Sequence, residues 1–298
     1  MDADRDPVVI GEVPMPRLMA VMNASPESFS GGVVDSASVV EVAQEHVADG
    51  ASVLDVGGQS LRTDEPELPV EVELDRSVPL LRALREAFGA DGPDLSVDTY
   101  RAPVAAAAVE AGATIVNDPS GLRDPDLLAV VRDSGVQVVV TYNLARPKVR
   151  LQADELASDP VADGLASLRE RIERLVEAGV SESQVLVDPG PDLGKSPAQT
   201  VAVLRELEAF RSLGRPLLLA LSRKDVIGAT LRRSPAERAA GLDGVLAALD
   251  LRADDVIRVH EPRTVRDFYV MRAVIAGDVE VPDDLSLPVH LRHRPPPA

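Results

Sequence analysis

The stretch RLMAVMNASPESFS (residues 17–30) decides the fold. It opens with an unbroken apolar run at residues 18–22, which is typical of a parallel strand covered on both faces. The run ends on Asn23, and Ser25-Pro26 then turns the chain. In α/β proteins, ligands bind at the carboxyl ends of parallel strands. The stretch therefore predicts a buried strand with a binding residue at its end.

The same order of apolar strand, polar terminus, loop and helix recurs along the chain. Strict alternation of strands and helices implies parallel strands, and eight such units predict a barrel. Strands are expected at residues 17–23, 52–56, 95–97, 114–116, 136–140, 185–187, 217–221 and 256–259. Helices are expected at about 36–50, 69–88, 102–111, 126–134, 161–178, 198–210, 236–250 and 264–276.

A doubly wound open sheet is the alternative architecture. Its dinucleotide-binding form carries a Gly-x-Gly turn after the first strand, where this chain reads Asn-Ala-Ser-Pro. The chain shows no linker, composition break or domain-scale repeat. We therefore expect one α/β domain over residues 1–298, a single (β/α)₈ TIM barrel with its core at about 15–277 and a proline-rich tail at 281–298.

Charge and composition exclude several classes of function. A net charge of −18 and an aromatic content of 2% make the chain a poor binder of nucleic acid or of an anionic membrane. The absence of cysteine excludes disulfides, thiolate metal sites and cysteine nucleophiles. No apolar run reaches the roughly 20 residues of a membrane span, and the acidic N-terminus lacks the features of a secretory signal. We expect a soluble, cytoplasmic protein without nucleic-acid or membrane partners.

Polar and charged side chains stand at the ends of the expected strands. In a closed barrel these ends meet at one mouth, so residues distant in sequence become neighbours. A lone Asp or Asn at a strand end more often simply meets solvent, but a converging set indicates a site. The set is Asn23, Asp55, Asp98, Asn117, Asp188, Lys224, Arg258 and His260.

The residue types predict a ligand with two unlike ends. Buried Asp and Asn offer donors and acceptors in a fixed pattern, which suits a flat heterocycle with several nitrogens. We assign this end to Asp98, Asn117, Asp188 and Lys224. The other end favours a phosphate or a metal-bound phosphate. Its candidates are Asn23, Arg62, Arg258 and His260, with a salt bridge at the barrel rim as the alternative for each arginine.

Metal and nucleotide motifs are few. The chain has neither a GxxxxGK[ST] loop nor an HExxH helix, and three of its four histidines fall in a helix or the tail. Any metal is therefore expected to be Mg²⁺ on oxygen ligands and phosphate.

Seven ordered segments at the strand ends resemble those of the dihydropteroate synthases, a family of pterin-binding barrels, over about residues 15–277. The family joins a dihydropterin methyl diphosphate to 4-aminobenzoate and releases pyrophosphate with Mg²⁺. The segments are MNASPESFS (22–30), DVGGQSLR (55–62), SVDTYR (96–101), IVND (115–118), VDPGPDLGK (187–195), SRK (222–224) and RVH (258–260).

The resemblance implies roles by position. Asp98, Asn117, Asp188 and Lys224 match the family's pterin pocket. Asn23, Arg258 and His260 match its diphosphate and Mg²⁺ end, with Asn23 as the metal ligand, and the catalytic group is Lys224, Arg258, His260 and Asn23. Arg62 and Ser222 match positions near the diphosphate and the aminobenzoate carboxylate. The resemblance also implies a homodimer.

The departures from the family cluster on the side of the second substrate. The usual Gly-Glu-Ser-Thr-Arg-Pro reads GQSLRT (residues 58–63), so Leu61 and Thr63 replace a hydroxyl and a rigid proline. The first loop loses an acid, and Leu193 replaces an aromatic that packs on aminobenzoate. We expect retained pterin binding with slow or absent condensation with 4-aminobenzoate.

Four interpretations stay open. The chain is a dihydropteroate synthase with tolerant loops, a paralogue that uses another nucleophile, or a pterin-binding protein without turnover. A methyltetrahydrofolate methyltransferase is the fourth and is less favoured, because SRK (222–224) and RVH (258–260) match the synthase branch.

Overall fold

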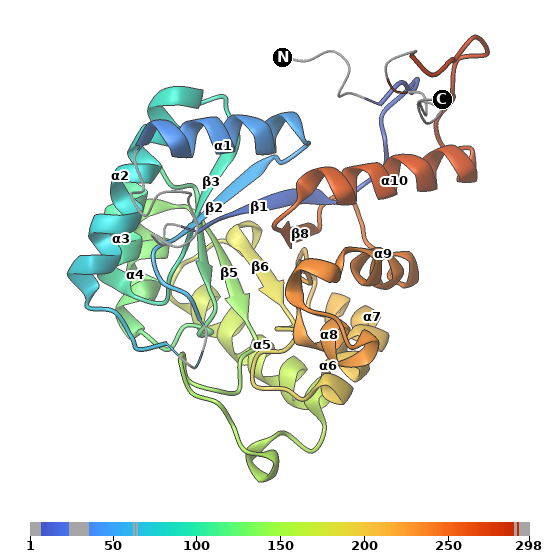
Figure 1. Cartoon of the computed structure of the whole chain (residues 1–298). Coiled ribbons are helices and arrows are strands. Elements are labelled where there is room, and N and C mark those ends of the chain that lie inside the picture. Colours follow the sequence, from blue (N-terminus) through green and yellow to red (C-terminus); the bar gives the residue numbers. More distant parts are fainter. Residues whose placement is uncertain (1–6, 24–35, 62, 64, 289–290, 292–298) are drawn as a thin grey trace.

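The computed structural model describes residues 7–23, 36–61, 63, 65–288 and 291. Its centre is a sheet of eight parallel strands in the order β6-β5-β4-β3-β2-β1-β8-β7, and Figure 1 shows the helices around its outside. The strands are β1 (Arg17–Asn23), β2 (Val53–Gly57), β3 (Asp94–Asp98), β4 (Ile115–Asp118), β5 (Gln137–Thr141), β6 (Val185–Asp188), β7 (Leu218–Ala220) and β8 (Val256–Val259). The predicted (β/α)₈ barrel is confirmed.

Helices alternate with the strands along the chain. Residues that the sequence marks as caps begin several of them, such as Asp124 before α4 and Asp159 before α5, whose carboxylates accept from backbone N–H groups. The helices are α1 (Ser36–Ala48), α2 (Val70–Phe88), α3 (Ala102–Glu110), α4 (Pro125–Ser134), α5 (Pro160–Glu177), α6 (Pro197–Arg205), α7 (Leu207–Arg211), α8 (Asp225–Leu231), α9 (Ala239–Ala248) and α10 (Pro262–Ala276).

The period of two along each strand divides the core into two parts. One set of apolar side chains faces the helices, and the other fills the interior of the barrel below its mouth. The interior set is Met19, Val53, Ile115, Val139, Leu186, Leu218 and Val256, with Ala220 packed against it. Side chains two and four residues further along each strand therefore face the same interior, nearer to the mouth.

The barrel closes between β6 and β7 by a sparse contact. Val187 forms a single parallel bridge with Leu217, and its N–H donates to the carbonyl of Pro216 at 3.0 Å. The other neighbouring strands pair over at least three residues each, as β7 does with β8 from Leu218 to Ala220. The seam between β6 and β7 is thus the weakest link of the ring.

Several boundaries differ from the predicted ones. The helix expected at 198–210 is two helices, α6 and α7, which meet at Glu206. The helix expected at 236–250 begins only at Ala239, and α8 was not predicted at all. Lys224 precedes α8 directly, so this short helix belongs to the structure around the mouth.

Among the described residues, no helix is both long enough and apolar enough to cross a membrane.

A buried ion pair holds the amino-terminal end of the barrel. Arg211 of α7 donates to both carboxylate oxygens of Asp255, at 3.1 and 2.7 Å. The same carboxylate accepts from the backbone N–H groups of Leu217 and Arg252, at 2.9 and 2.7 Å. Asp255 is fully buried. One side chain therefore connects α7 to the starts of β7 and β8.

We predict that Asp255→Ala lowers the free energy of unfolding by about 3–5 kcal/mol, because the buried Arg211 guanidinium loses its buried counter-charge and keeps only the exposed Glu208, at 3.4 Å. Denaturant unfolding measures the loss. Asp133→Ala removes an exposed partner of Arg132 and is the control, with an expected loss far smaller than that of Asp255→Ala. Equal losses in the two variants would contradict this role for Asp255.

Candidate functional site

The strand register brings the predicted residues to one mouth. Asn23 lies beside Gly57, Gly57 beside Asp98, and Asp98 beside Asn117. Thr141 at the end of β5 lies beside Asp188 at the end of β6. Ser222 and His260 follow β7 and β8 in the inward-facing phase. Side chains from the carboxyl ends of seven strands therefore surround this mouth, and β2 ends there on Gly57.

Arg258 occupies the centre of this group. Its Nε donates to Oδ2 of Asp55 at 2.6 Å, and its Nη2 donates to Oδ2 of Asp98 at 2.7 Å. Asp55 also accepts from Oγ of Ser96 at 2.5 Å and from Nδ2 of Asn117 at 3.2 Å. One guanidinium thus neutralises two carboxylates that come from different strands.

The environment of Arg258 changes two expectations. Asp55 is in the middle of β2 rather than at its end, and it is fully buried, one layer below the mouth. It therefore supports the site from beneath. Arg258 has the salt bridge that was the alternative for each arginine, although inside the barrel rather than on its rim. Contact between Arg258 and an anion stays a prediction.

Burial raises the pKa of both acids on the floor of the mouth. Burial raises the pKa of Asp98 to about 7, against the opposite effect of Arg258. Burial also raises the pKa of Asp188, although the Gly190 N–H donates to its Oδ1 at 2.7 Å. Near neutral pH, Asp98 in its protonated form and the Asn117 amide can donate hydrogen bonds, and the carboxylate and amide oxygens can accept them. A flat heterocycle with ring nitrogens and amino groups requires that mixture.

The cationic side of the mouth comes from a tight turn after β7. Arg223 adopts a left-handed conformation with φ of 60°, and Lys224 is the N-cap residue directly before α8. Burial lowers the pKa of Lys224, whereas the carboxylates of Asp192 and Asp188 raise it. Burial and the nearby acids thus act on Lys224 in opposite directions, and it makes no direct ion pair among the described residues.

His260 is a neutral group in this setting. Its Nδ1 lies 3.0 Å from Oγ of Ser222. Burial and the positive charges of Arg223, Arg258 and Lys224 lower the pKa of His260 to about 3. The neutral imidazole can therefore donate a hydrogen bond to an anion but carries no positive charge to attract it.

The loop after β6 is locked by a lysine that sequence reasoning missed. Nζ of Lys195 donates to the carbonyls of Tyr142, Gly190 and Leu193, at 3.1, 2.8 and 3.0 Å. A Cβ on Gly190 would lie 2.0 Å from the Tyr142 carbonyl, so only glycine fits there. Burial lowers the pKa of Lys195 to about 7. The signal available in the sequence was a lysine that closes a Gly-rich turn.

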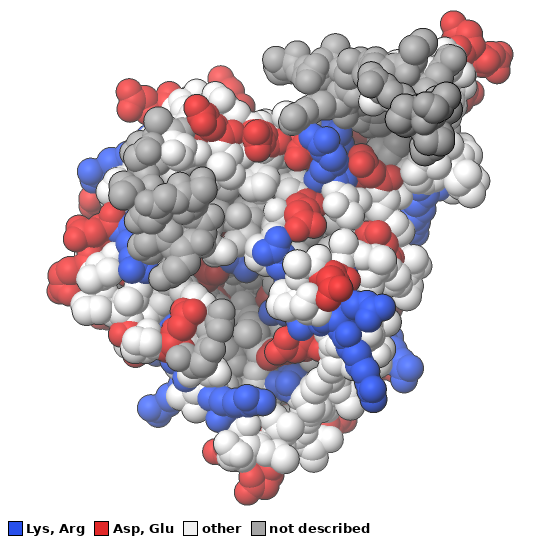
Figure 2. Space-filling view, in the orientation of Figure 1, with Lys and Arg blue, Asp and Glu red and all other residues white. Residues whose placement is uncertain are grey.

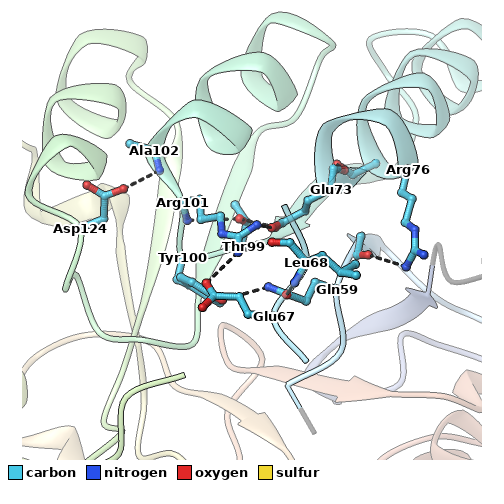
Figure 3. Close-up of polar contacts among 12 residues, drawn as sticks. Gln59, Glu67, Leu68, Glu73, Arg76, Thr99, Tyr100, Arg101, Ala102 and Asp124 are labelled. Atoms are coloured by element: carbon cyan, nitrogen blue, oxygen red, sulfur yellow. Dashed lines mark hydrogen bonds and ion pairs between the residues drawn. The ribbon is translucent and has the colours of Figure 1, made fainter. Parts of the chain in front are cut away.

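The loop after β2 is tied to the loop after β3 by the network in Figure 3. Nε2 of Gln59 donates to the Tyr100 hydroxyl at 2.9 Å, and its Oε1 accepts from the Leu68 N–H at 2.6 Å. The Tyr100 hydroxyl donates to Glu67, which also pairs with Arg101. Arg101 further pairs with the buried Glu73. Gln59 thus supplies a hydrogen that a glutamate, the family's usual residue there, could supply only when protonated.

Some predicted residues lie outside this description. Arg62 and the first loop from residue 24 to 35 are not among the described residues. Asn23 is described and exposed at the end of β1. Within the described part of the chain, no group of three or more His, Asp or Glu side chains could hold a metal ion.

The chain matches the family model described as pterin binding enzyme over residues 19–260. It is 36% identical to dihydropteroate synthase of Bacillus subtilis (strain 168) over 251 residues, 83% of this chain and 84% of that one. It is 37% identical over 271 residues to a Mycobacterium tuberculosis (strain ATCC 25618 / H37Rv) protein named inactive dihydropteroate synthase 2, covering 87% of this chain and 83% of the relative. A structure of Xanthomonas albilineans dihydropteroate synthase with 4-aminobenzoic acid has a TM-score of 0.77 and 36% identity, covering 88% of this chain and 93% of the other.

We predict that Asp98 makes stability depend on pH. Its pKa rises from an ordinary 3.8 to about 7 on folding, so the folded chain holds a proton that the unfolded chain has lost. The free energy of unfolding should therefore fall as the pH rises from about 4 through about 7. Denaturant unfolding across this range should show a smaller fall in Asp98→Asn. Identical pH profiles would refute the assignment.

We predict that Gln59→Glu loosens the loop after β2 as the pH rises. The new carboxylate can donate to Tyr100 only when protonated, so folding raises its pKa and the loop loses stability above it. The expected cost at pH 8 is about 1–3 kcal/mol, with a smaller cost at pH 5. Unfolding measurements at both pH values provide the check. In a Tyr100→Phe background the cost of Gln59→Glu should shrink, and an unchanged cost would contradict the proposed contact.

Proposed function

Because the chain belongs to the family of pterin binding enzymes, we propose that it binds a dihydropterin methyl diphosphate at the barrel mouth and transfers the pterin to an aromatic amine. The amine is 4-aminobenzoate or a related compound, and pyrophosphate is released. The observation that carries this proposal is the buried set of acids and amide around Arg258, whose donors and acceptors suit a nitrogen heterocycle.

The pterin ring is assigned to the floor of the mouth. Asp98 and Asp188 face the ring N–H and amino groups, and Asn117 both donates and accepts. Lys224 donates to a ring carbonyl or ring nitrogen. Arg258 supports these contacts, because it fixes the Asp98 carboxylate at 2.7 Å. Ligand binding then replaces water at groups that are already oriented.

The diphosphate is assigned to Asn23, Arg62, His260 and the open side of Arg258. The donor set fits Mg²⁺ in one way only: Asn23 supplies a single amide oxygen, and phosphate oxygens and water complete the shell. Mg²⁺ bound there would neutralise charge on the departing diphosphate. The neutral imidazole of His260 donates a hydrogen bond to the same group.

The reaction is a substitution at the exocyclic CH₂ of the pterin. The C–O bond to diphosphate breaks first or early, a C–N bond to the amine forms, and the amine nitrogen loses one proton. The electron-rich pterin stabilises the positive charge that develops on the CH₂. Ser222 and Arg62 position the carboxylate of the amine, so most of the catalysis lies in positioning and charge stabilisation.

A second candidate is a pterin-binding protein with little or no turnover. The observation that favours it is the set of substitutions on the amine side, Leu61, Thr63 and Leu193. A relative that is 37% identical and named inactive dihydropteroate synthase 2 also supports this candidate. A paralogue with a different amine nucleophile is the intermediate case.

We also propose a homodimer through the face formed by α9 and α10. Ile275 and Met271 are 80% and 56% exposed there, and Phe268 contributes to the same shallow apolar surface. A pair of such surfaces buried together is favoured by the hydrophobic effect. Light scattering measures the mass, and Ile275→Asp should yield monomer. The cytoplasmic location expected from composition stays part of this proposal.

The pterin assignment is tested by Asp188→Asn, which keeps the size of the side chain and removes its charge. We expect affinity for the pterin diphosphate to fall by about 1.5–3 kcal/mol through loss of charge-assisted hydrogen bonds. Calorimetry with Mg²⁺ present measures it. Asp133→Asn, on the surface of α4, is the control. Unchanged affinity in Asp188→Asn would end the assignment.

The amine assignment is tested by steady-state turnover with 4-aminobenzoate. The lost ring contact and the lost hydroxyl together predict a ten- to hundredfold lower affinity for 4-aminobenzoate, since 1.4 kcal/mol is about tenfold in affinity. Slow condensation that improves in the Leu61→Thr, Thr63→Pro double variant supports the transferase. Retained pterin binding with zero turnover in both proteins supports the second candidate.

A further inference from the structure

A groove with basic walls lies on the rim of the barrel, beside the mouth. Its volume is about 730 Å³, and it runs between the loops after β3, β4 and β5 and the outer face of α5. None of Asp98, Asn117, Asp188 and Lys224 lines it. The lining includes five arginines and three acids: Arg101, Arg123, Arg146, Arg171 and Arg174, with Glu67, Asp124 and Glu170.

Two of the three acids already have hydrogen-bond or ion-pair partners. Glu67 pairs with Arg101 and accepts from Tyr100, as Figure 3 shows. Asp124 caps α4 and accepts from the Ala102 N–H at 2.9 Å. Glu170 is thus the one acid of the lining left to balance the charge of the four arginines other than Arg101.

Those four arginines lack a carboxylate partner among the described residues. Arg123 donates to the carbonyls of Asn143, Leu144 and Ala145, and Arg171 donates to that of Thr141 at 2.9 Å. Carbonyls fix the position of a guanidinium without cancelling its charge. Burial and the nearby Arg123 lower the pKa of Arg171, although the carboxylates of Asp118 and Glu170 partly oppose them. The side chains of Arg146 and Arg174 are exposed and make no hydrogen bond or ion pair within the described chain.

Such a concentration of positive charge is unusual in this protein. The chain carries 49 acidic and 31 basic residues, so its general field repels anions. Figure 2 shows basic and acidic side chains interspersed around the hollowed centre of the face that it presents. A local cluster that overcomes the overall charge is therefore expected to have a ligand, and guanidinium pairs suit phosphate or carboxylate.

We propose that this groove is a second binding site, separate from the mouth, for a small polyanion with two or more phosphate or carboxylate groups. Its volume falls within the range of about 300–1,000 Å³ that is usual for small-molecule pockets. The net charge of −18 disfavours nucleic acid as the occupant. A neighbouring hollow of about 300 Å³ shares Arg123, Glu170 and Arg171, so an extended ligand can reach both.

The test is calorimetric titration of the full chain with inorganic tripolyphosphate. The variant is Arg146→Gln with Arg174→Gln, two exposed positions whose change leaves the fold intact. The control is Arg150→Gln with Arg169→Gln, which removes the same charge from the same loop and helix, outside the groove. We expect at least about tenfold weaker binding in the groove variant and less than about twofold change in the control.

A second comparison separates the groove from the mouth. His260→Ala weakens the proposed diphosphate end and should leave binding of tripolyphosphate to the groove unchanged. Equal losses in the groove variant and the control would show only a general field, and no loss in either would show that the groove has no ligand. Either outcome overturns the proposal, as does loss of all tripolyphosphate binding in His260→Ala.

Discussion

The bridge from Arg258 to Asp55 and Asp98 is the interaction on which the site depends. Two buried carboxylates at neighbouring strands repel each other, and each is costly to bury without a counter-charge. The guanidinium resolves both problems with two hydrogen bonds in fixed directions, at 2.6 and 2.7 Å. The orientation of Asp98 toward the mouth, and through Asp55 that of the Asn117 amide, follows from this bridge.

The barrel and its mouth could be predicted because they follow from periodicity. Apolar runs ending on polar residues identified all eight strands, and the closed topology then required Asn23, Asp98, Asn117 and Asp188 to meet. Helix divisions were harder, since the break at Glu206 and the short α8 depend on how the chain packs. The apolar pattern of 3.6 residues continues across the break at Glu206, so the sequence predicts one helix where there are two.

The partners of the site residues could not be predicted. Nothing in the order of residues says that Arg258 pairs with Asp55, 203 positions away, or that Lys195 bonds to three carbonyls. The pKa of His260 could not be predicted from the sequence either. His260 is neutral because of burial and neighbouring cations that only the fold brings together. Sequence identifies the chemical groups at a mouth, whereas three-dimensional neighbours decide their charge.

The seam between β6 and β7 has a mechanical consequence for the mouth. Asp188 ends β6, and Ser222 and Lys224 follow β7, so the seam separates the acid from the cationic turn. In the part of the chain that the structure describes, one bridge and one backbone hydrogen bond to Pro216 join the two strands there. Widening the pocket across the seam separates one bridged pair of residues, while widening it between β3 and β4 separates three paired residues. The contact between β6 and β7 is therefore the part of the barrel that deforms most easily. It sets the direction in which the mouth can widen.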